Sequence, residues 1–155
     1  MDYVGLFGYV DDVGRVLDIT IEDADVNSVQ GSYVGCVAGY NLGRISNCHV
    51  SGKVSAGSYV GGMIGRNQGG AVLMCSADVN VVGEIYQIGG LIGRSESGGV
   101  YNCYATGSVQ GSDAVGGLIG DHRYGDVNNC FADTSVVTLS SSAGGFWVKI
   151  IRGWS

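Results

Sequence analysis

Two aspartates, Asp78 and Asp133, are the side chains in this sequence whose spacing comes closest to a catalytic arrangement. Each stands three residues after a cysteine, and Ser51 and Thr106 stand at the same offset from two further cysteines. Carboxylates ~6.5–9.5 Å apart serve as the acid and the base of inverting glycosidases. No lysine, arginine or third acid occupies an equivalent position, or the one two residues before it, where it would shift a pKa or stabilise an anion. The sequence therefore predicts no catalytic residue and no enzyme.

The cysteines and histidines do not form a metal-binding pattern. None of the five cysteines belongs to a Cys-x-x-Cys pair, which zinc sites commonly use. His49 and His122 fall several repeats apart and cannot share a metal. Gly52-Lys53 is followed by Val54, which excludes a phosphate loop, and the Gly-Gly-Leu-Ile-Gly segments lack the following helix of a dinucleotide site. We expect no metal site and no cofactor.

The composition predicts a folded chain. Of the 155 residues, 29 are glycine and none is proline, while 45% are hydrophobic and 14% are charged. This hydrophobic content excludes a disordered tail, and the lack of proline excludes collagen. No apolar run approaches ~18 residues and no charged and apolar leader follows Met1, so we expect neither membrane insertion nor a signal peptide in this chain. We expect a single domain over residues 1–155.

Negative charge is concentrated at the N-terminal end. Residues 1–32 hold seven acids and one base, Arg15, while residues 33–155 balance seven acids against seven bases. No basic cluster is present that could neutralise phosphates or bind an anionic membrane, so nucleic acid is excluded as a partner. The excess of six negative charges should also repel a second copy of the chain at this end.

Two motifs recur with a common period. The segment Val-Gly-Gly-Leu-Ile-Gly at residues 115–120 has counterparts at 88–93, 60–65 and 34–39, with a shorter one at 5–8. A cysteine preceded by Asn or Met recurs at 47–48, 74–75, 102–103 and 129–130, in steps of 27 or 28 residues. A fixed period of ~20–50 residues is typical of solenoids and other repeat arrays.

The pattern within each repeat is that of β-strands. Cys103, Ala105 and Val109 share one parity and alternate with polar or aromatic side chains. Asn102, just before them, is suited to the left-handed conformation that a corner requires. The sequence therefore predicts an all-β fold, a right-handed parallel β-helix (β-solenoid) of about five coils with ~27 residues per coil. The expected coils are residues 1–32, 33–58, 59–86, 87–113 and 114–142, with 143–155 as a C-terminal cap or partial coil.

Stacked coils bring equivalent residues into columns about 4.8 Å apart. Four such columns are predicted to be buried, namely Val16/Ile45/Val72/Val100/Val127, Ile19/Cys48/Cys75/Cys103/Cys130, Ile21/Val50/Ala77/Ala105/Ala132 and Val26/Val54/Val81/Val109/Val136. The parallel cysteine side chains would be too far apart for unstrained disulfides. We therefore expect reduced thiols that act as small buried hydrophobes.

The repeats resemble a known family. Gly5-Leu-Phe-Gly-Tyr-Val10, the recurring Val-Gly-Gly-Leu-Ile-Gly and Asn-Cys-Tyr-Ala-Thr-Gly are similar to the GLUG-motif repeat of bacterial surface proteins, which include adhesins and the stalks of immunoglobulin-A-cleaving peptidases. The resemblance covers residues 3–145 and departs from the pattern at Cys36, Ala38 and Met74. It implies an extracellular or cell-surface location.

The resemblance and the missing active site favour a non-catalytic structural or adhesive module that acts as a spacer or interaction scaffold. An alternative is a carbohydrate-binding face formed by Tyr104 and Phe131, which fall at equivalent outward positions of neighbouring coils. A second alternative is a polysaccharide-degrading enzyme that uses Asp78 and Asp133. The partner is left open as a protein or a glycan, and the binding residues are unknown. The unpaired edges of a solenoid also favour end-to-end self-association.

Overall fold

The computed structural model describes residues 2–138, and all regular structure in this range is β-strand. The strands are β1 (Phe7–Val10), β2 (Arg15–Leu17), β3 (Thr20–Val34), β4 (Ala38–Asn41), β5 (Arg44–Ser46), β6 (His49–Gly61), β7 (Ile64–Gln68), β8 (Ala71–Leu73), β9 (Ser76–Gly83), β10 (Tyr86–Gly89), β11 (Ile92–Glu96), β12 (Val100–Tyr101), β13 (Tyr104–Gly111), β14 (Asp113–Gly116), β15 (Ile119–His122), β16 (Val127–Asn128) and β17 (Phe131–Thr138). No helix that could cross a bilayer occurs among the described residues.

The strands form three sheets in which every pairing is parallel. One sheet has the order β1-β4-β7-β11-β15 and another the order β2-β5-β8-β12-β16. In the third sheet, β6 pairs with β3, with β9 through residues 49–56, and with β10 through residues 60–61. This sheet continues from β9 to β13 and β17, and from β10 to β14. The third sheet therefore bends around one corner of each coil.

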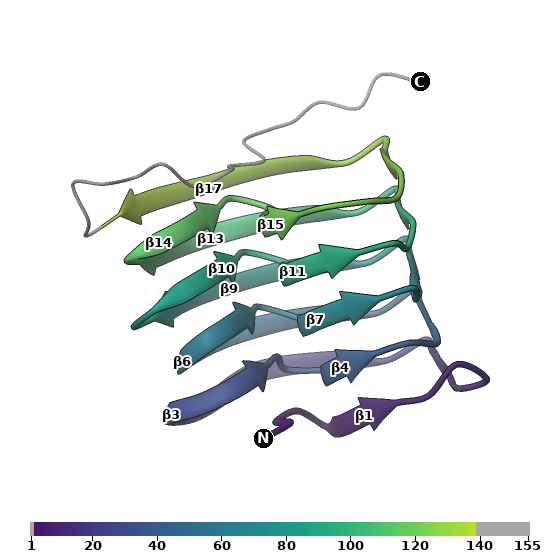
Figure 1. Ribbon diagram of the computed structural model, residues 1–155, viewed down its shortest axis with the longest axis horizontal. Helices are drawn as coiled ribbons and strands as arrows, with labels where there is room; N and C mark the ends of the chain where they lie inside the picture. The colour runs from purple at the N-terminus through teal and green to yellow at the C-terminus, as the bar shows by residue number, and fades with distance from the viewer. Residues whose placement is uncertain (1, 139–155) are drawn as a thin grey trace.

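The chain climbs as a stack of similar coils (Figure 1). On the front face of this view β4, β7 and β11 run to the right, and the chain then passes behind and returns one level higher, which is the path of a right-handed coil. The predicted parallel β-solenoid of about five coils is confirmed. Its division at the coil boundaries given above stays a prediction, and the cap or partial coil at residues 143–155 lies outside the described residues.

The register of the strands confirms the four predicted columns. Their central members are buried, and Ile45, Cys48, Val72, Ala77, Val81, Val100 and Ala105 are fully enclosed. The prediction that every member is buried is wrong for Val136, which is 41% exposed. Val136 belongs to the last described coil, and Ile19, Ile21 and Val26 of the first coil are only partly buried. These coils have a described neighbour on one side only, so one face of each column lacks its second wall.

Two columns of corner residues adopt the left-handed conformation. The predicted corner at Asn102 has a φ of 55°, and the equivalent residues Asp18, Asn47, Met74 and Asn129 have φ between 52° and 58°. A second corner, which the sequence does not reveal, has φ values of 60°, 52°, 63° and 51° at Tyr33, Tyr59, Gln87 and Ala114. This corner points the side chains of the two tyrosines onto the face formed by β4, β7 and β11, where they meet Tyr40, Arg66 and Arg94.

Backbone contact between coils explains the glycine content. A Cβ atom placed on Gly93 would lie 2.6 Å from the Gly65 carbonyl oxygen, 2.6 Å from the Val60 nitrogen and 2.7 Å from the Tyr59 carbonyl carbon. All three are backbone atoms, so none can turn aside as a side chain would. Glycine is required here for close approach of the chain.

One corner of the coil is closed by buried asparagines. Asn41 and Asn67 lie opposite each other in the register of β4 and β7 and are fully buried. The Asn41 side chain donates to the Gly43 carbonyl (3.1 Å) and to Asn67 Oδ1 (2.8 Å) and accepts from the Gly43 nitrogen (3.1 Å), and Asn67 donates to the Gly70 carbonyl (2.9 Å). Each amide therefore holds a turn of two residues, 42–43 or 69–70, between consecutive strands.

The later coils close the same corner with other residues. Ser95 and His122 occupy the next two places of this column. The buried hydroxyl of Ser95 has no hydrogen-bond partner, while His122 Nε2 lies 3.1 Å from the Gly125 carbonyl oxygen. His122 is the last residue of β15. The supporting residue therefore changes while the path to the next column keeps its length, because Val72, Val100 and Val127 each follow five positions after this column.

Asn67→Ala should lower the free energy of unfolding by about 2–3 kcal/mol, because the Asn41 amide and the Gly70 carbonyl would each lose a partner inside the core. Urea unfolding monitored by circular dichroism measures this loss. Asn80→Ala is a matched control, since Asn80 lies on the exposed outer face of β9, and it should change stability by less than about 0.5 kcal/mol. Equal losses in the two variants would contradict the role assigned to the buried amide.

Candidate functional site

The predicted aspartate column is present but has no catalytic environment. Ser51, Asp78, Thr106 and Asp133 lie opposite one another in the register of β6, β9, β13 and β17. Asp78 and Asp133 are exposed on the outer face of this sheet, two coils apart, or about 9–10 Å. The described residues provide no ion pair to either carboxylate. Within the described residues, this arrangement offers neither the desolvation nor the neighbouring charge that would let one carboxylate act as the acid and the other as the base.

Tyr104 and Phe131 form the predicted outward aromatic pair. Their ring centroids are 5.0 Å apart with planes inclined by 4°, and the residues are 40% and 46% exposed. Each ring covers part of one face of the other, and within the described residues the second face of each ring has no aromatic partner. His49, in the same column, lies with Nδ1 2.6 Å from the Ser76 hydroxyl. The sequence therefore places this pair correctly.

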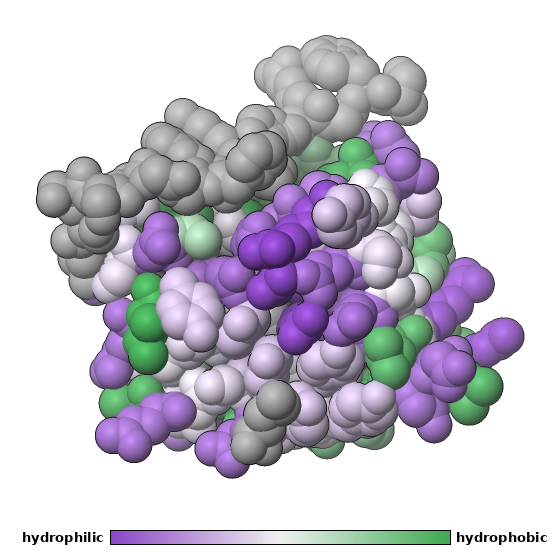
Figure 2. All heavy atoms as spheres, in the orientation of Figure 1, coloured by the Kyte–Doolittle hydropathy of each residue, from purple (hydrophilic) through white to green (hydrophobic). Residues whose placement is uncertain are grey.

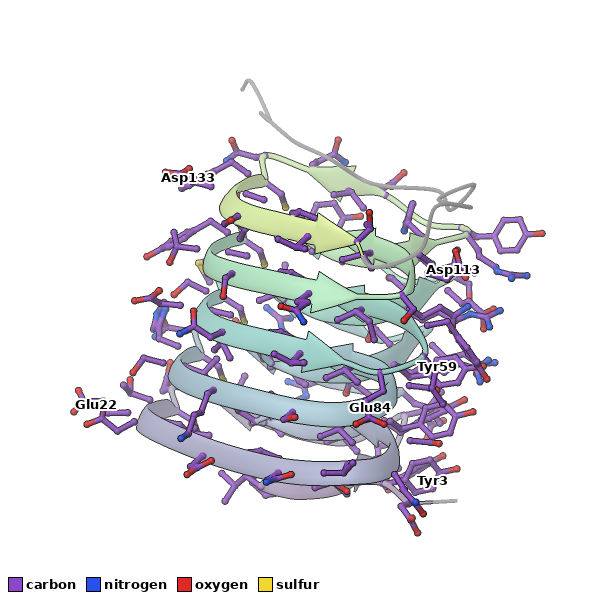
Figure 3. The ribbon with its side chains drawn as sticks, turned by 90° about the vertical axis from the view of Figure 1, so that its left-hand side faces the viewer. Tyr3, Glu22, Tyr59, Glu84, Asp113 and Asp133 are labelled. Atoms are coloured by element: carbon purple, nitrogen blue, oxygen red, sulfur yellow. The ribbon has the colours of Figure 1, made fainter. Side chains whose placement is uncertain are left out.

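A larger aromatic surface, which the sequence did not predict, lies on the face formed by β1, β4, β7 and β11. We define this tyrosine-arginine face as Tyr3, Tyr9, Tyr33, Tyr40, Tyr59, Tyr86, Arg66 and Arg94. Tyr33 stacks on Tyr59 (4.5 Å, 18°) and Tyr9 stacks on Tyr40 (5.4 Å, 11°). Figure 3 shows Tyr3 and Tyr59 on one side of the stack and Asp133 on the other. The tyrosine-arginine face is thus distinct from the aspartate column.

Charged side chains continue this surface over β7, β11 and β15. The guanidinium of Arg66 lies 5.4 Å from the ring centre of Tyr40, and its Nη2 is 2.6 Å from Glu96 Oε2. Arg94 contacts the same carboxylate, and its Nε is 3.7 Å from Asp121 Oδ2. Figure 2 shows strongly hydrophilic side chains gathered at the centre of this face. The network joins three consecutive coils by alternating positive and negative charge.

Glu96 is the centre of the network. Burial alone would raise the pKa of Glu96, but hydrogen bonds and positive charge from Arg66 and Arg94 outweigh it and hold the pKa below its ordinary value. Its side chain is 16% exposed, and Arg123 approaches it to 4.0 Å from the next coil. The carboxylate is therefore held ionised between cations, which is the arrangement of a structural ion network rather than of an acid catalyst.

Acidification should destabilise the fold through Glu96. Because its folded-state pKa is depressed, Glu96 stabilises the protein above its unfolded-state pKa, ~4.3, and this contribution is lost as pH falls through the folded-state value. Melting temperatures measured between about pH 7 and pH 3 should fall less steeply for Glu96→Gln than for the natural chain. Glu84→Gln, at an exposed glutamate, is the control. Parallel curves for the natural chain and Glu96→Gln would contradict this role.

The signal for the tyrosine-arginine face was present in the sequence. Tyr33 and Tyr59 directly precede the Val-Gly motif in two consecutive repeats, and Tyr40, Arg66 and Arg94 occupy one register column. These positions lie outside the four columns predicted from the sequence. Tyr33 and Tyr59 reach this face only because they adopt the left-handed conformation at the second corner. Tyrosine rarely adopts this conformation.

The thiols of the cysteine column are buried and unpaired, as predicted, and so is that of Cys36. Cys75, Cys103 and Cys130 each donate to the backbone carbonyl two residues earlier, at 3.2 Å. Burial raises the pKa of Cys36 to about 11, and thiol contacts with Cys130 and Cys75, together with burial, raise the pKa of Cys103. Among residues 2–138, no three His, Cys, Asp or Glu side chains are grouped to hold a metal ion.

Comparison with known proteins identifies the repeats. A family model described as the GLUG motif matches residues 30–55 and 85–110. Halomucin of Haloquadratum walsbyi is 40% identical to this chain over 80 residues, which are 51% of this chain and 1% of the length of halomucin. No solved structure matches. Each matched segment is as long as one coil and begins just before the left-handed corner at Tyr33 or Gln87. The chain thus carries GLUG motifs, and each of the two matched motifs forms about one turn of its β-solenoid.

Proposed function

We propose that this chain is a non-catalytic module of a surface protein and acts as a spacer or interaction scaffold. The observation that carries the proposal is the stack of parallel coils with its four columns in register, with apolar side chains inside and, among the described residues, no acid-base pair in a shielded environment. Each coil uses ~27 residues and lengthens the stack by about 4.8 Å. The stack is therefore broad for its length and supplies a rigid support.

The location at a surface is supported by the GLUG motifs, which resemble repeats of bacterial surface proteins, and by the similarity to halomucin. Labelling of intact and lysed producing cells with an antibody against residues 2–138 tests it. We expect equal labelling of the two samples. Labelling that appears only after lysis would overturn the surface location.

A glycan-binding role is the second candidate, because Tyr104 and Phe131 are stacked on each other and both are exposed. Aromatic rings of this kind pack against the apolar faces of sugars. A glycan array probed with the natural chain and with Tyr104→Ala/Phe131→Ala tests the role. Binding that the double variant loses supports it, while uniform absence of binding, or binding that the variant retains, removes it.

The non-catalytic part of the proposal is tested by incubation with pectin, alginate and hyaluronan. We expect no new reducing ends and no unsaturated product, because Asp78 and Asp133 are exposed and form no ion pair within residues 2–138. Product formation that Asp78→Asn abolishes would replace the scaffold by the polysaccharide-degrading alternative.

A further inference from the structure

Two arginines stand apart from the other basic residues of the described chain. Residues 2–138 contain six Lys and Arg side chains. Lys53, Arg66, Arg94 and Arg123 each form an ion pair. Arg15 and Arg44, the remaining two, have neither an ion pair nor a side-chain hydrogen bond within the described residues. Their positive charges are therefore not neutralised by the fold.

The same two arginines lie directly opposite each other. Arg15 of β2 pairs with Arg44 of β5 in the parallel register, which places their Cα atoms about 4.8 Å apart. Both residues are exposed, and the next member of the column is Ala71. Like charges at directly opposite positions of a sheet destabilise it. The pair thus maintains a local repulsion in a chain whose net charge is −6.

The arginine pair separates two shallow grooves. One groove, of about 390 Å³, is bordered by Asp12, Gly43, Gly69 and Ala71, and the other, of about 510 Å³, by Leu17, Asp18, Asn47 and Met74. Arg15 and Arg44 line both. Leu17 and Met74 are 46% and 51% exposed, so the larger groove offers apolar surface beside the two guanidinium groups.

We propose that Arg15 and Arg44 form an oxyanion-binding site for the carboxylate of a uronic acid sugar. A guanidinium donates two parallel hydrogen bonds to a carboxylate, and two neighbouring guanidinium groups can share one anion. The ring carbons of the sugar would then pack on Leu17 and Met74. Asp12 and Asp18 at the outer borders disfavour a densely charged polyanion, so the site suits a ligand with isolated carboxylates.

Calorimetric titration of the full chain with tetragalacturonate, its neutral methyl ester and inorganic sulfate at low ionic strength tests the site. Tetragalacturonate should bind, and Arg15→Ala/Arg44→Ala should weaken that binding by at least about tenfold. The methyl ester should bind much more weakly than the acid. Binding of sulfate as tight as that of tetragalacturonate would overturn the sugar as ligand and leave a site for free anions.

Lys53→Ala is the matched control because it removes a positive charge from an exposed side chain of another sheet. It should leave the affinity for tetragalacturonate unchanged. Without ligand, Arg15→Ala/Arg44→Ala should melt at the same temperature as the natural chain or higher, since the repulsion is removed. Absence of binding, retained affinity in the double variant, or equal weakening in Lys53→Ala would overturn the site. None of these outcomes bears on the surface location, which the labelling experiment tests separately.

Discussion

Replacing Cys103 by aspartate should abolish folding of the chain. Cys103 is 1% exposed in the middle of the cysteine column, with Cys75 below and Cys130 above, and its thiol donates to the Tyr101 carbonyl. Within the described residues, no ion pair lies in this column. A carboxylate there would be buried without a counterion, which costs several kcal/mol even if the group becomes protonated.

Far-ultraviolet circular dichroism and size-exclusion chromatography of Cys103→Asp measure this outcome. Cys103→Ala, which keeps the site apolar, should fold and lose about 1–2 kcal/mol of stability. Tyr104→Asp places the same charge at the next residue, on the outer face, and should also fold. A folded Cys103→Asp with stability close to that of Cys103→Ala would show that the column is open to solvent.

Gly93→Ala should destabilise the fold by at least about 3 kcal/mol. The added methyl group would meet three backbone atoms of Gly65, Val60 and Tyr59 at 2.6–2.7 Å. This steric overlap can be relieved only if the two coils move apart, and that movement would break the parallel hydrogen bonds between β7 and β11. One methyl group is thus expected to affect a whole interface between coils.

Thermal unfolding of Gly93→Ala measures this effect, and Gly69→Asn is its control. A Cβ atom on Gly69 would have no heavy atom closer than 3.8 Å, and asparagine accepts the positive φ of 80° found there. Gly69→Asn should therefore melt within a few degrees of the natural chain. Similar melting temperatures for Gly93→Ala and the natural chain would show that the coils can separate locally without loss of stability.

The sequence predicts the repeat architecture well because the coil is determined by local features repeated many times. The period, the inward parity of Cys103 and Ala105 and the left-handed corner at Asn102 are all confirmed. The parity and the corner rest on rules that hold within ten residues, and repetition in four or five coils removes the ambiguity of any single strand. The exposed Val136 is the exception, because burial at an end depends on what covers the coil.

The candidate surfaces could be predicted only in part. Tyr104 and Phe131 share a strand pattern with the cysteines, so their stacking follows from the period. The contact of Glu96 with Arg94 follows from the alternation of one strand, whereas Glu96 meets Arg66 only because β7 and β11 are in register. No local propensity reports such a meeting. The unpaired state of Arg15 and Arg44 likewise requires knowledge of every neighbour.

The variable turn next to the asparagine column has a consequence for how such chains diversify. Three residues separate Asn41 from the column of Ile45, Val72, Val100 and Val127, and four residues separate Asn67, Ser95 and His122 from it, while the strands on either side keep their register. Insertions at this corner therefore leave the stack intact, and duplication of a coil would copy the insertion along with it. New loops can therefore be inserted at this corner during evolution. The segment 123–126 is the place where a peptide epitope can be grafted for display.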